Sequence, residues 1–283
     1  MSLRLFSPAK INLFLRVIRK RPDQYHDISS LFQAISLGDI LTIRISKSGQ
    51  DSLICQNPNL ICDESNLIHK AIQIYRQKTG ISNRFDIQLE KKIPIEAGLG
   101  GGSSNAATTL WGCNQLCGEN ASVEELMQWG SEIGSDIPFF FSEGTAFCTG
   151  RGENVMNLPS LPFQKIQVYM PKEGLSTAEV FKRLEIPIDS SKNTHDEIQP
   201  YLNGSFDLFN DLETPAFQIN PRLKILKDRL ISYGFKKVLM TGSGTAFFCM
   251  GGSEETVPQN QDLEHFSAHF INRKINEWYS IFE

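Results

Sequence analysis

Hydrophobic and polar positions along this chain switch repeatedly between the two-residue period of a strand and the spacing of a helix. Residues 39–45 and 84–90 alternate strictly enough to predict strands. Between them, the apolar residues of 67–75 recur with helical spacing, after Asn66 as an N-cap and before Gly80 as a stop. The chain is therefore expected to fold from interleaved strands and helices.

The same kind of pattern continues through the rest of the chain. Ser122, followed by Glu125, is a capping box that predicts the start of a helix. Pro8 interrupts the first apolar run, so we expect a strand that is broken near that residue. His265 and His269 stand four residues apart and are expected on the exposed face of the last helix. Further strands are expected at residues 3–17, 144–149, 165–170, 236–240 and 245–250, and further helices at 105–111, 176–184, 221–233 and 263–278.

The prolines within residues 158–162 mark the best domain boundary in the sequence. We expect one domain over residues 1–158 and a second over residues 159–283, because a chain of this length can form two domains. The interleaved elements on both sides of the boundary predict an α+β fold. The polar segment 189–203 carries no informative pattern.

Charge and hydropathy exclude several classes of function. A formal net charge of −4 and only short basic clusters argue against a nucleic-acid-binding face. No apolar run reaches the roughly 18–20 residues of a membrane span, and the N-terminal residues lack the pattern of a signal peptide. The six cysteines fit reduced thiols, although Cys113 and Cys117, four residues apart on a predicted helix, could share a metal. We therefore expect a cytoplasmic protein that binds neither nucleic acid nor a membrane.

The most informative segment is the run at residues 98–104, where four glycines and two serines precede a helical stretch. Glycine lets a ligand approach the backbone closely, and a helix N-terminus offers free N–H groups to a phosphate. The run lacks the Lys-Ser or Lys-Thr of a Walker A loop, and no dinucleotide-binding βαβ unit surrounds it. A flexible linker is the alternative, but ordered elements are expected on both sides. The run therefore predicts a cradle for nucleotide phosphates.

Three further segments carry candidate chemistry. Lys10 and Asn12 stand two residues apart in an apolar strand and so point to one face, although an edge strand facing water is the alternative. Asp136 lies between a glycine and an apolar run, where a carboxylate either caps a turn or acts at a site. Residues 240–248 place glycines around a serine between two strands, which fits a tight hairpin or a second backbone surface facing phosphates.

Together these segments resemble the GHMP kinase superfamily, the group of galactokinase, homoserine kinase, mevalonate kinase and phosphomevalonate kinase. The sequences at residues 7–15, 21–26, 98–107 and 134–140 are most similar to the branch that phosphorylates a cytidine diphosphate-linked polyol for isoprenoid synthesis without mevalonate. The resemblance implies a two-domain GHMP kinase fold. Its N-terminal domain would be a mixed α/β ATP-binding domain, and its C-terminal domain a ferredoxin-like α+β substrate domain.

The resemblance also implies roles for individual residues in phosphoryl transfer. Asp136 matches the aspartate that takes the proton of the substrate hydroxyl, and Lys10 matches the lysine beside the transferring phosphoryl group. ATP would be the co-substrate, together with Mg²⁺, for which Ser104 is the only candidate protein ligand. The residues that match ATP-binding positions are Asn66, Pro94, Gly98, Leu99, Gly100, Gly101, Gly102, Ser103, Ser104 and Asn105.

A second set of residues matches positions that recognise the substrate. Tyr25 would stack on the cytosine ring and His26 would form hydrogen bonds with it. Phe181 matches a second aromatic residue that would sandwich the base, with a helix core residue as the alternative. Asn12, Thr177 and Asp136 would line the rest of this pocket. The expected partner is thus a small molecule, and the sequence leaves monomer and homodimer both open.

One departure from the family pattern concerns Gln24, which stands where the family usually has glycine, so the turn before Tyr25 is expected to differ in shape. Two alternatives stay open: another small-molecule kinase of the superfamily, similar to homoserine kinase, and a catalytically silent nucleotide-binding sensor. Tyr25, His26 and Phe181 argue against the first alternative, because such a kinase has no cytidine to recognise. The presence of both a lysine and an aspartate at the catalytic positions argues against the second.

Overall fold

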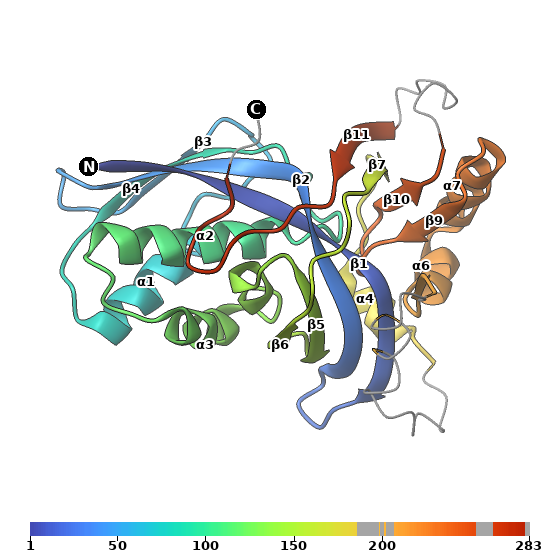
Figure 1. The fold of residues 1–283 in the computed structure, drawn as a ribbon, viewed down its shortest axis with the longest axis horizontal. Helices are drawn as coiled ribbons and strands as arrows, with labels where there is room; N and C mark the ends of the chain where they lie inside the picture. Colours follow the sequence, from blue (N-terminus) through green and yellow to red (C-terminus); the bar gives the residue numbers. More distant parts are fainter. Residues whose placement is uncertain (186–197, 199–200, 202–206, 253–262, 281–283) are drawn as a thin grey trace.

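In a computed structural model, the chain forms two sheets that lie beside one another, with helices packed against both (Figure 1). The structure describes residues 1–185, 198, 201, 207–252 and 263–280. Most of the expected segment at 189–203 lies outside these residues. Among the described helices, none has the length and apolar character needed to span a bilayer.

The first sheet is built around a long antiparallel pair, β1 (Ser2–Lys20) and β2 (His26–Ile45). Its strand order is β3-β4-β2-β1-β8, and β5 pairs with the early part of β2 and with β6. The other strands are β3 (Ser52–Cys55), β4 (Phe85–Glu90), β5 (Thr145–Gly150), β6 (Asn154–Asn157) and the short β8 (Phe209–Asn210). β1 and β2 are the centre of this sheet: β2 pairs with β1, β4 and β5, and β1 also pairs with β8.

Helices pack against the first sheet, and the predicted caps explain where two of them start. They are α1 (Leu67–Thr79), α2 (Gly101–Leu116), α3 (Val123–Ile133) and the 3₁₀ turn η1 (Pro138–Phe141). Asn66 accepts a hydrogen bond from the Ile68 amide at the start of α1, and Gly80 ends that helix with a φ of 72°. Ser122 and Glu125 form the expected capping box of α3. These predictions are confirmed.

The second sheet is antiparallel, with the order β11-β7-β10-β9. Its strands are β7 (Lys165–Pro171), β9 (Lys237–Met240), β10 (Phe247–Met250) and β11 (Leu263–His269). The described helices of this part are α4 (Thr177–Lys182), α6 (Glu213–Ile219) and α7 (Pro221–Ser232). Leu223, Leu226 and Leu230 of α7 share one buried core with β9 and β10. Strands and helices are thus mixed throughout, as the α+β expectation requires.

The helix expected at residues 263–278 is wrong. Residues 263–269 form β11, which pairs with β7 at the edge of the second sheet. His265 is therefore a strand residue, and its ring stacks on that of Tyr169 with the ring centroids 4.6 Å apart. The apolar positions in this segment also fit a helix, and the free edge of β7 decides for the strand.

Two smaller differences concern β1 and α2. β1 runs straight through Pro8 instead of breaking there, because a register shift between Pro8 and Ala9 absorbs the missing donor as a bulge. α2 begins at Gly101, four residues before its expected start, so half of the glycine-rich run is helical. Gly100 is the N-cap with a φ of 70°, a conformation that glycine adopts without strain.

The described C-terminal residues pack against the first sheet and its helices. The Trp278 indole N–H donates to the Phe6 carbonyl at 2.8 Å, and its ring stacks on Trp111 and meets the edge of Phe141. Arg273 donates to the Phe141 carbonyl, and Tyr279 is buried. The core beneath the first sheet therefore includes side chains from both ends of the described chain. The division at residues 158/159 stays a prediction; β6 ends at Asn157 and β7 begins at Lys165.

Candidate active site

A cavity of about 950 Å³ is lined by residues from both the part around the first sheet and the part around the second sheet. Most of the predicted site residues line it. Its walls come from β1, the start of β2, the glycine-rich run, the loop before η1, the start of α4 and the turn between β9 and β10. The predicted residues that line it are Lys10, Asn12, Tyr25, His26, Gly98, Gly100, Ser103, Asp136, Thr177 and Phe181. Residues from five separate parts of the sequence therefore share one space.

Lys10 and Asp136 form an ion pair in this cavity. The Lys10 ammonium lies 3.4 Å from the nearer Asp136 carboxylate oxygen. It also donates to the Asn12 side-chain oxygen at 2.8 Å and lies 4.4 Å from the centre of the Phe32 ring. A buried ammonium needs such partners, because desolvation of an isolated charge is costly. The prediction that Lys10 and Asn12 share a face is confirmed.

The turn between β9 and β10 joins this network through Thr241. The Thr241 hydroxyl accepts a hydrogen bond from the Asn12 backbone amide at 3.0 Å, and it donates to the Asn12 side-chain oxygen at 3.2 Å. These two residues are 229 positions apart, so the contact connects the first strand of the chain with the second sheet. Sequence reasoning singled out this turn but gave Thr241 no role; the only signal was its place beside a glycine.

The same turn packs backbone to backbone against the glycine-rich run. A Cβ atom on Gly98 would lie 2.2 Å from the Thr241 carbonyl oxygen, and one on Gly244 would lie 2.3 Å from the Ala97 carbonyl carbon. The Ala246 amide also donates to the Ala97 carbonyl at 3.3 Å. The connection between β9 and β10 is therefore a hairpin loop over residues 241–246 whose backbone contacts the glycine-rich run, and its role as a surface facing phosphates stays a prediction.

A buried carboxylate holds the other side of the glycine-rich run. Asp39 accepts hydrogen bonds from the Lys91 ammonium at 2.6 Å and the Asn105 side-chain amide at 2.9 Å. It also accepts from the backbone amides of residues 92 and 93 at 2.7 and 2.8 Å. Burial lowers the pKa of Lys91, and the nearby Asp39 charge opposes that shift. Asp39 therefore connects residues 91–93, which precede the glycine-rich run, with Asn105 of α2.

Several residues matched to ATP-binding positions do not line the cavity. Asn105 directs its amide to Asp39 and Ser7, and the buried Ser104 hydroxyl accepts a hydrogen bond from Ser7 at 2.8 Å. Asn66 is engaged in the cap of α1. The predicted residues outside the cavity lining are Asn66, Pro94, Leu99, Gly101, Gly102, Ser104 and Asn105.

Aromatic side chains line the opposite end of the cavity. The rings of His26 and Phe181 stack with centroids 4.8 Å apart and an angle of 26° between their planes. Tyr25 is 57% exposed, and the Arg151 guanidinium lies 5.2 Å from its ring centre. Burial, followed by the Lys20 charge, lowers the pKa of His26 below its usual 6.5. The imidazole is therefore neutral near pH 7 and can both donate and accept a hydrogen bond.

Gln24 and Thr177 complete this end of the site. Gln24 adopts a φ of 72°, the left-handed conformation that glycine favours, so the turn keeps a glycine-like shape at some cost in strain. The Thr177 hydroxyl accepts a hydrogen bond from the Ser243 hydroxyl at 2.7 Å. Ser243, Arg151 and Lys20 line the cavity; the sequence marked Ser243 only as the serine between two glycines and did not single out Arg151 or Lys20.

Metal-binding groups are absent from the described residues: no three His, Cys, Asp or Glu side chains cluster in a way that could hold an ion. Cys113 and Cys117 are free thiols, and burial raises the pKa of both. A cation in the cavity would therefore depend on oxygen atoms from a ligand as well as from the protein.

Comparison with known families agrees with this architecture. Residues 66–144 match the model of the GHMP kinase N-terminal domain, and residues 188–270 match that of the GHMP kinase C-terminal domain. A solved structure of homoserine kinase from Cytophaga hutchinsonii has the same fold, with a TM-score of 0.73 over 96% of both chains at 17% identity. The fold is that of a GHMP kinase.

More similar relatives narrow the family. A 4-diphosphocytidyl-2-C-methyl-D-erythritol kinase from Protochlamydia amoebophila is 56% identical, over 99% of this chain and 93% of the relative. The chloroplastic enzyme of Arabidopsis thaliana is 45% identical over 98% of this chain and 76% of its own length. A crystal structure of 4-(cytidine 5'-diphospho)-2C-methyl-D-erythritol kinase superposes with a TM-score of 0.78 at 30% identity, covering 95% of this chain and all of the other. The chain belongs to the 4-diphosphocytidyl-2-C-methyl-D-erythritol kinase family.

Proposed function

We propose that this chain transfers the γ-phosphoryl group of ATP to the 2-hydroxyl of 4-diphosphocytidyl-2-C-methyl-D-erythritol, giving the 2-phosphate and ADP. The observation that carries the proposal is the shared cavity. It holds a lysine–aspartate pair beside the glycine-rich run and a group of aromatic residues at its other end. A phosphate cradle, a base and a nucleobase-sized aromatic surface are the three parts that this reaction needs.

Asp136 acts as the general base in this proposal. Its carboxylate is 30% exposed toward the cavity, while the side chain of Lys10 is 4% exposed. The carboxylate faces the cavity, where it can accept the proton of the attacking hydroxyl. The Lys10 ammonium stabilises negative charge on the transferring phosphoryl group, and phosphoryl transfer depends mainly on such positioning and electrostatics.

The glycine-rich run binds the ATP phosphates through its backbone. Gly98, Gly100 and Ser103 face the cavity, and α2 begins inside the run, so the helix N-terminus is directed at the site. Mg²⁺ would neutralise charge on the β- and γ-phosphates when bound. Ser103 and Asp136 are among the residues with side-chain oxygen atoms that line the cavity, whereas the buried Ser104 hydroxyl accepts a hydrogen bond from Ser7.

The cytidine end of the substrate binds among Tyr25, His26 and Phe181. A cytosine ring presents flat faces for stacking and an edge with both donors and acceptors, which matches two aromatic rings and a neutral imidazole. Asn12 and Thr177 would contact the methylerythritol and diphosphate portions. The same proposal places the chain in the cytoplasm as a monomer or homodimer.

The experiment is to measure ADP release from Mg-ATP with purified protein and three alcohols in parallel. The proposal expects turnover with 4-diphosphocytidyl-2-C-methyl-D-erythritol and none with homoserine or mevalonate. Turnover with another alcohol alone would keep the lysine–aspartate chemistry and reject the cytosine pocket. ATP binding without turnover on any of the three would identify a sensor instead of a kinase.

A further inference from the structure

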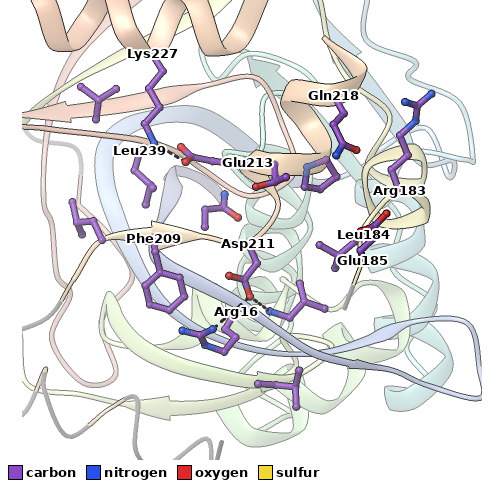
Figure 2. A pocket seen from close by; sticks show the side chains of 17 residues that line it. Arg16, Arg183, Leu184, Glu185, Phe209, Asp211, Glu213, Gln218, Lys227 and Leu239 are labelled. Carbon is purple, nitrogen blue, oxygen red and sulfur yellow. Dashed lines mark hydrogen bonds and ion pairs between the residues drawn. The ribbon is translucent and has the colours of Figure 1, made fainter. Parts of the chain in front are cut away.

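A second cavity is lined by residues of β1, β8, α6 and β9, the strand that precedes the turn carrying Thr241. It has a volume of about 560 Å³, and Figure 2 shows the Glu213–Lys227 ion pair and Asp211 on its walls. Asn210, Asp211 and Glu213 contribute to these walls, and the side chains of Asn210 and Glu213 hold the backbone of residues 240–242. This wall therefore links the second cavity to the candidate active site.

Asn210 makes three hydrogen bonds and is 6% exposed. Its side-chain amide donates to the Met240 carbonyl and to the Gly242 carbonyl, both at 2.8 Å. Its side-chain oxygen accepts from the Leu212 amide at 2.9 Å. The two carbonyls stand on either side of Thr241, so one side chain holds the backbone both before and after that residue.

Glu213 fixes a third backbone group of the same turn. One carboxylate oxygen accepts from the Met240 amide at 3.0 Å, and the other accepts from the Lys227 ammonium at 2.6 Å. Both side chains are largely buried, at 14% and 20% exposure, so this pair is only weakly screened by solvent. The backbone around Thr241 therefore has little freedom to shift.

The position of Thr241 is transmitted to the reacting groups by a short chain of contacts. Its hydroxyl is hydrogen-bonded to Asn12, Asn12 accepts from the Lys10 ammonium, and that ammonium pairs with Asp136. The first two links are buried polar contacts, and the third joins the buried Lys10 to Asp136, which is 30% exposed. Such networks lose more than one bond when a member moves.

We propose that Asn210 is a positioning residue for phosphoryl transfer, which acts through Thr241 and Asn12 on the placement of the Lys10 ammonium. This inference rests on the proposed kinase function. It concerns a residue that does not line the active-site cavity and that would not touch either substrate. The two hydrogen bonds from Asn210 to the Met240 and Gly242 carbonyls are called the clamp below. A displacement of about 1 Å in a reacting group can lower a rate about 100-fold, so loss of the clamp would reduce kcat without weakening substrate binding.

The test is a double-mutant cycle with Asn210→Ala and Thr241→Val, measured by ADP release. Each single variant is expected to lower kcat about 10- to 100-fold, with both KM values within about threefold of wild type. Because both act on one path, the double variant should be no worse than the more impaired single variant. Multiplying effects, or an unchanged kcat in Asn210→Ala, would overturn the inference.

Two further variants separate positioning from general loss of structure. Asn210→Asp keeps the size of the side chain and the acceptor for Leu212 but removes both donated bonds, so its kcat should fall as in Asn210→Ala. Asn220→Ala removes the cap of α7, where Asn220 accepts from the Arg222 amide, and touches none of this path. It should lower Tm but retain wild-type kcat; a similar loss of kcat there would assign the effect to stability.

Amide hydrogen exchange provides a readout that does not depend on turnover. Exchange across residues 240–246 should accelerate in Asn210→Ala, because the anchors on both sides of Thr241 are lost. Unchanged protection there would refute the clamp even if the proposed substrate proves wrong. If the wild-type protein fails to phosphorylate the cytidyl substrate while exchange responds as expected, the proposed function fails and the mechanical link stands.

Discussion

The Lys10 ammonium and the Asp136 carboxylate lie 3.4 Å apart but differ in their exposure to solvent, at 4% and 30% of their side chains. The cation is fixed by Asn12 and the Phe32 ring, whereas the carboxylate faces the cavity. This asymmetry suits a reaction in which the lysine stays charged and in place while the aspartate gains a proton. The pair therefore provides the first prediction.

Asp136→Asn should lower kcat by about 10²- to 10⁴-fold, because the amide cannot accept the proton of the substrate hydroxyl. The side chain keeps its size, so the dissociation constant of ATP should stay within about threefold of wild type. Steady-state kinetics and ATP titration measure the two effects. Near-normal turnover in a folded variant would remove Asp136 from the role of base.

His26 predicts a dependence of substrate binding on pH. Burial, followed by the Lys20 charge, lowers its pKa, so the imidazole is neutral near pH 7 and becomes a cation only at a pH lower than for an ordinary histidine. The cation loses its acceptor, so the KM for the cytidyl substrate should rise as the pH falls while the KM for ATP stays flat. Kinetics from about pH 8 to about pH 5.5 test this.

His26→Gln should lack the acidic rise in KM, since glutamine does not titrate. His69 is the matched control, because it lies on α1 outside the cavity lining, where its ring nitrogen contacts the Cys62 carbonyl. His69→Gln should keep the wild-type pH profile. An equal rise of both KM values in the wild-type protein would count against a cytosine contact at His26.

Gly98 and Gly102 should respond oppositely to the same substitution. Gly98 has a φ of 76°, and a Cβ there would lie 2.2 Å from the Thr241 carbonyl oxygen, so Gly98→Ala should cost about 3 kcal/mol or more of unfolding free energy. Gly102 is exposed in the first turn of α2, where a Cβ would meet only Leu67 at 3.5 Å. Gly102→Ala should raise the unfolding free energy by about 0.5–1 kcal/mol.

Chemical denaturation of the two glycine variants measures the difference directly. A similar stability for both would mean that the glycine-rich run and the β9–β10 turn are not in the close contact described above. The comparison is sharp because both substitutions add one methyl group to the same run.

The Asp39–Lys91 pair predicts a large effect on stability. Asp39→Asn leaves the Lys91 ammonium buried without its counterion and should cost about 3–5 kcal/mol of unfolding free energy. Glu90→Gln is the control, because the Arg4–Glu90 pair is about half exposed and should contribute less than about 1 kcal/mol. Denaturant titration of both variants decides; equal small losses would show that Asp39 does not hold the run.

The features that could be predicted from sequence are mostly local ones. Asn66 and Ser122 identify helix starts because capping is a contact over two or three residues. The segment at 263–278 failed for the opposite reason: its apolar spacing fits a helix, and the free edge of β7, about a hundred residues earlier in the chain, makes it a strand. Secondary structure that depends on a distant partner leaves little trace in its own sequence.

The site residues likewise fall into those that the sequence could indicate and those that only the structure shows. Lys10, Asn12 and Asp136 could be selected from their polar character in apolar surroundings, and the structure brings them together. Thr241 and Arg151 could not, because a threonine in a turn or an arginine on a loop is common, and Ser243 was visible only as a serine between two glycines. Their significance comes from contacts across 66 to 229 residues, such as that between Thr241 and Asn12.

The packing of Trp278 and Tyr279 against the first sheet and its helices has a consequence for how the chain is made. Trp278 lies against Phe6 and Trp111, so the core that supports the glycine-rich run stays open until residues near 279 have left the ribosome. Contacts this distant in sequence form late and slowly. During synthesis, the glycine-rich run and α2 would thus lack the covering contacts of Trp278 and Tyr279. Chaperones and proteases would therefore have access to this part of the chain before it is fully packed.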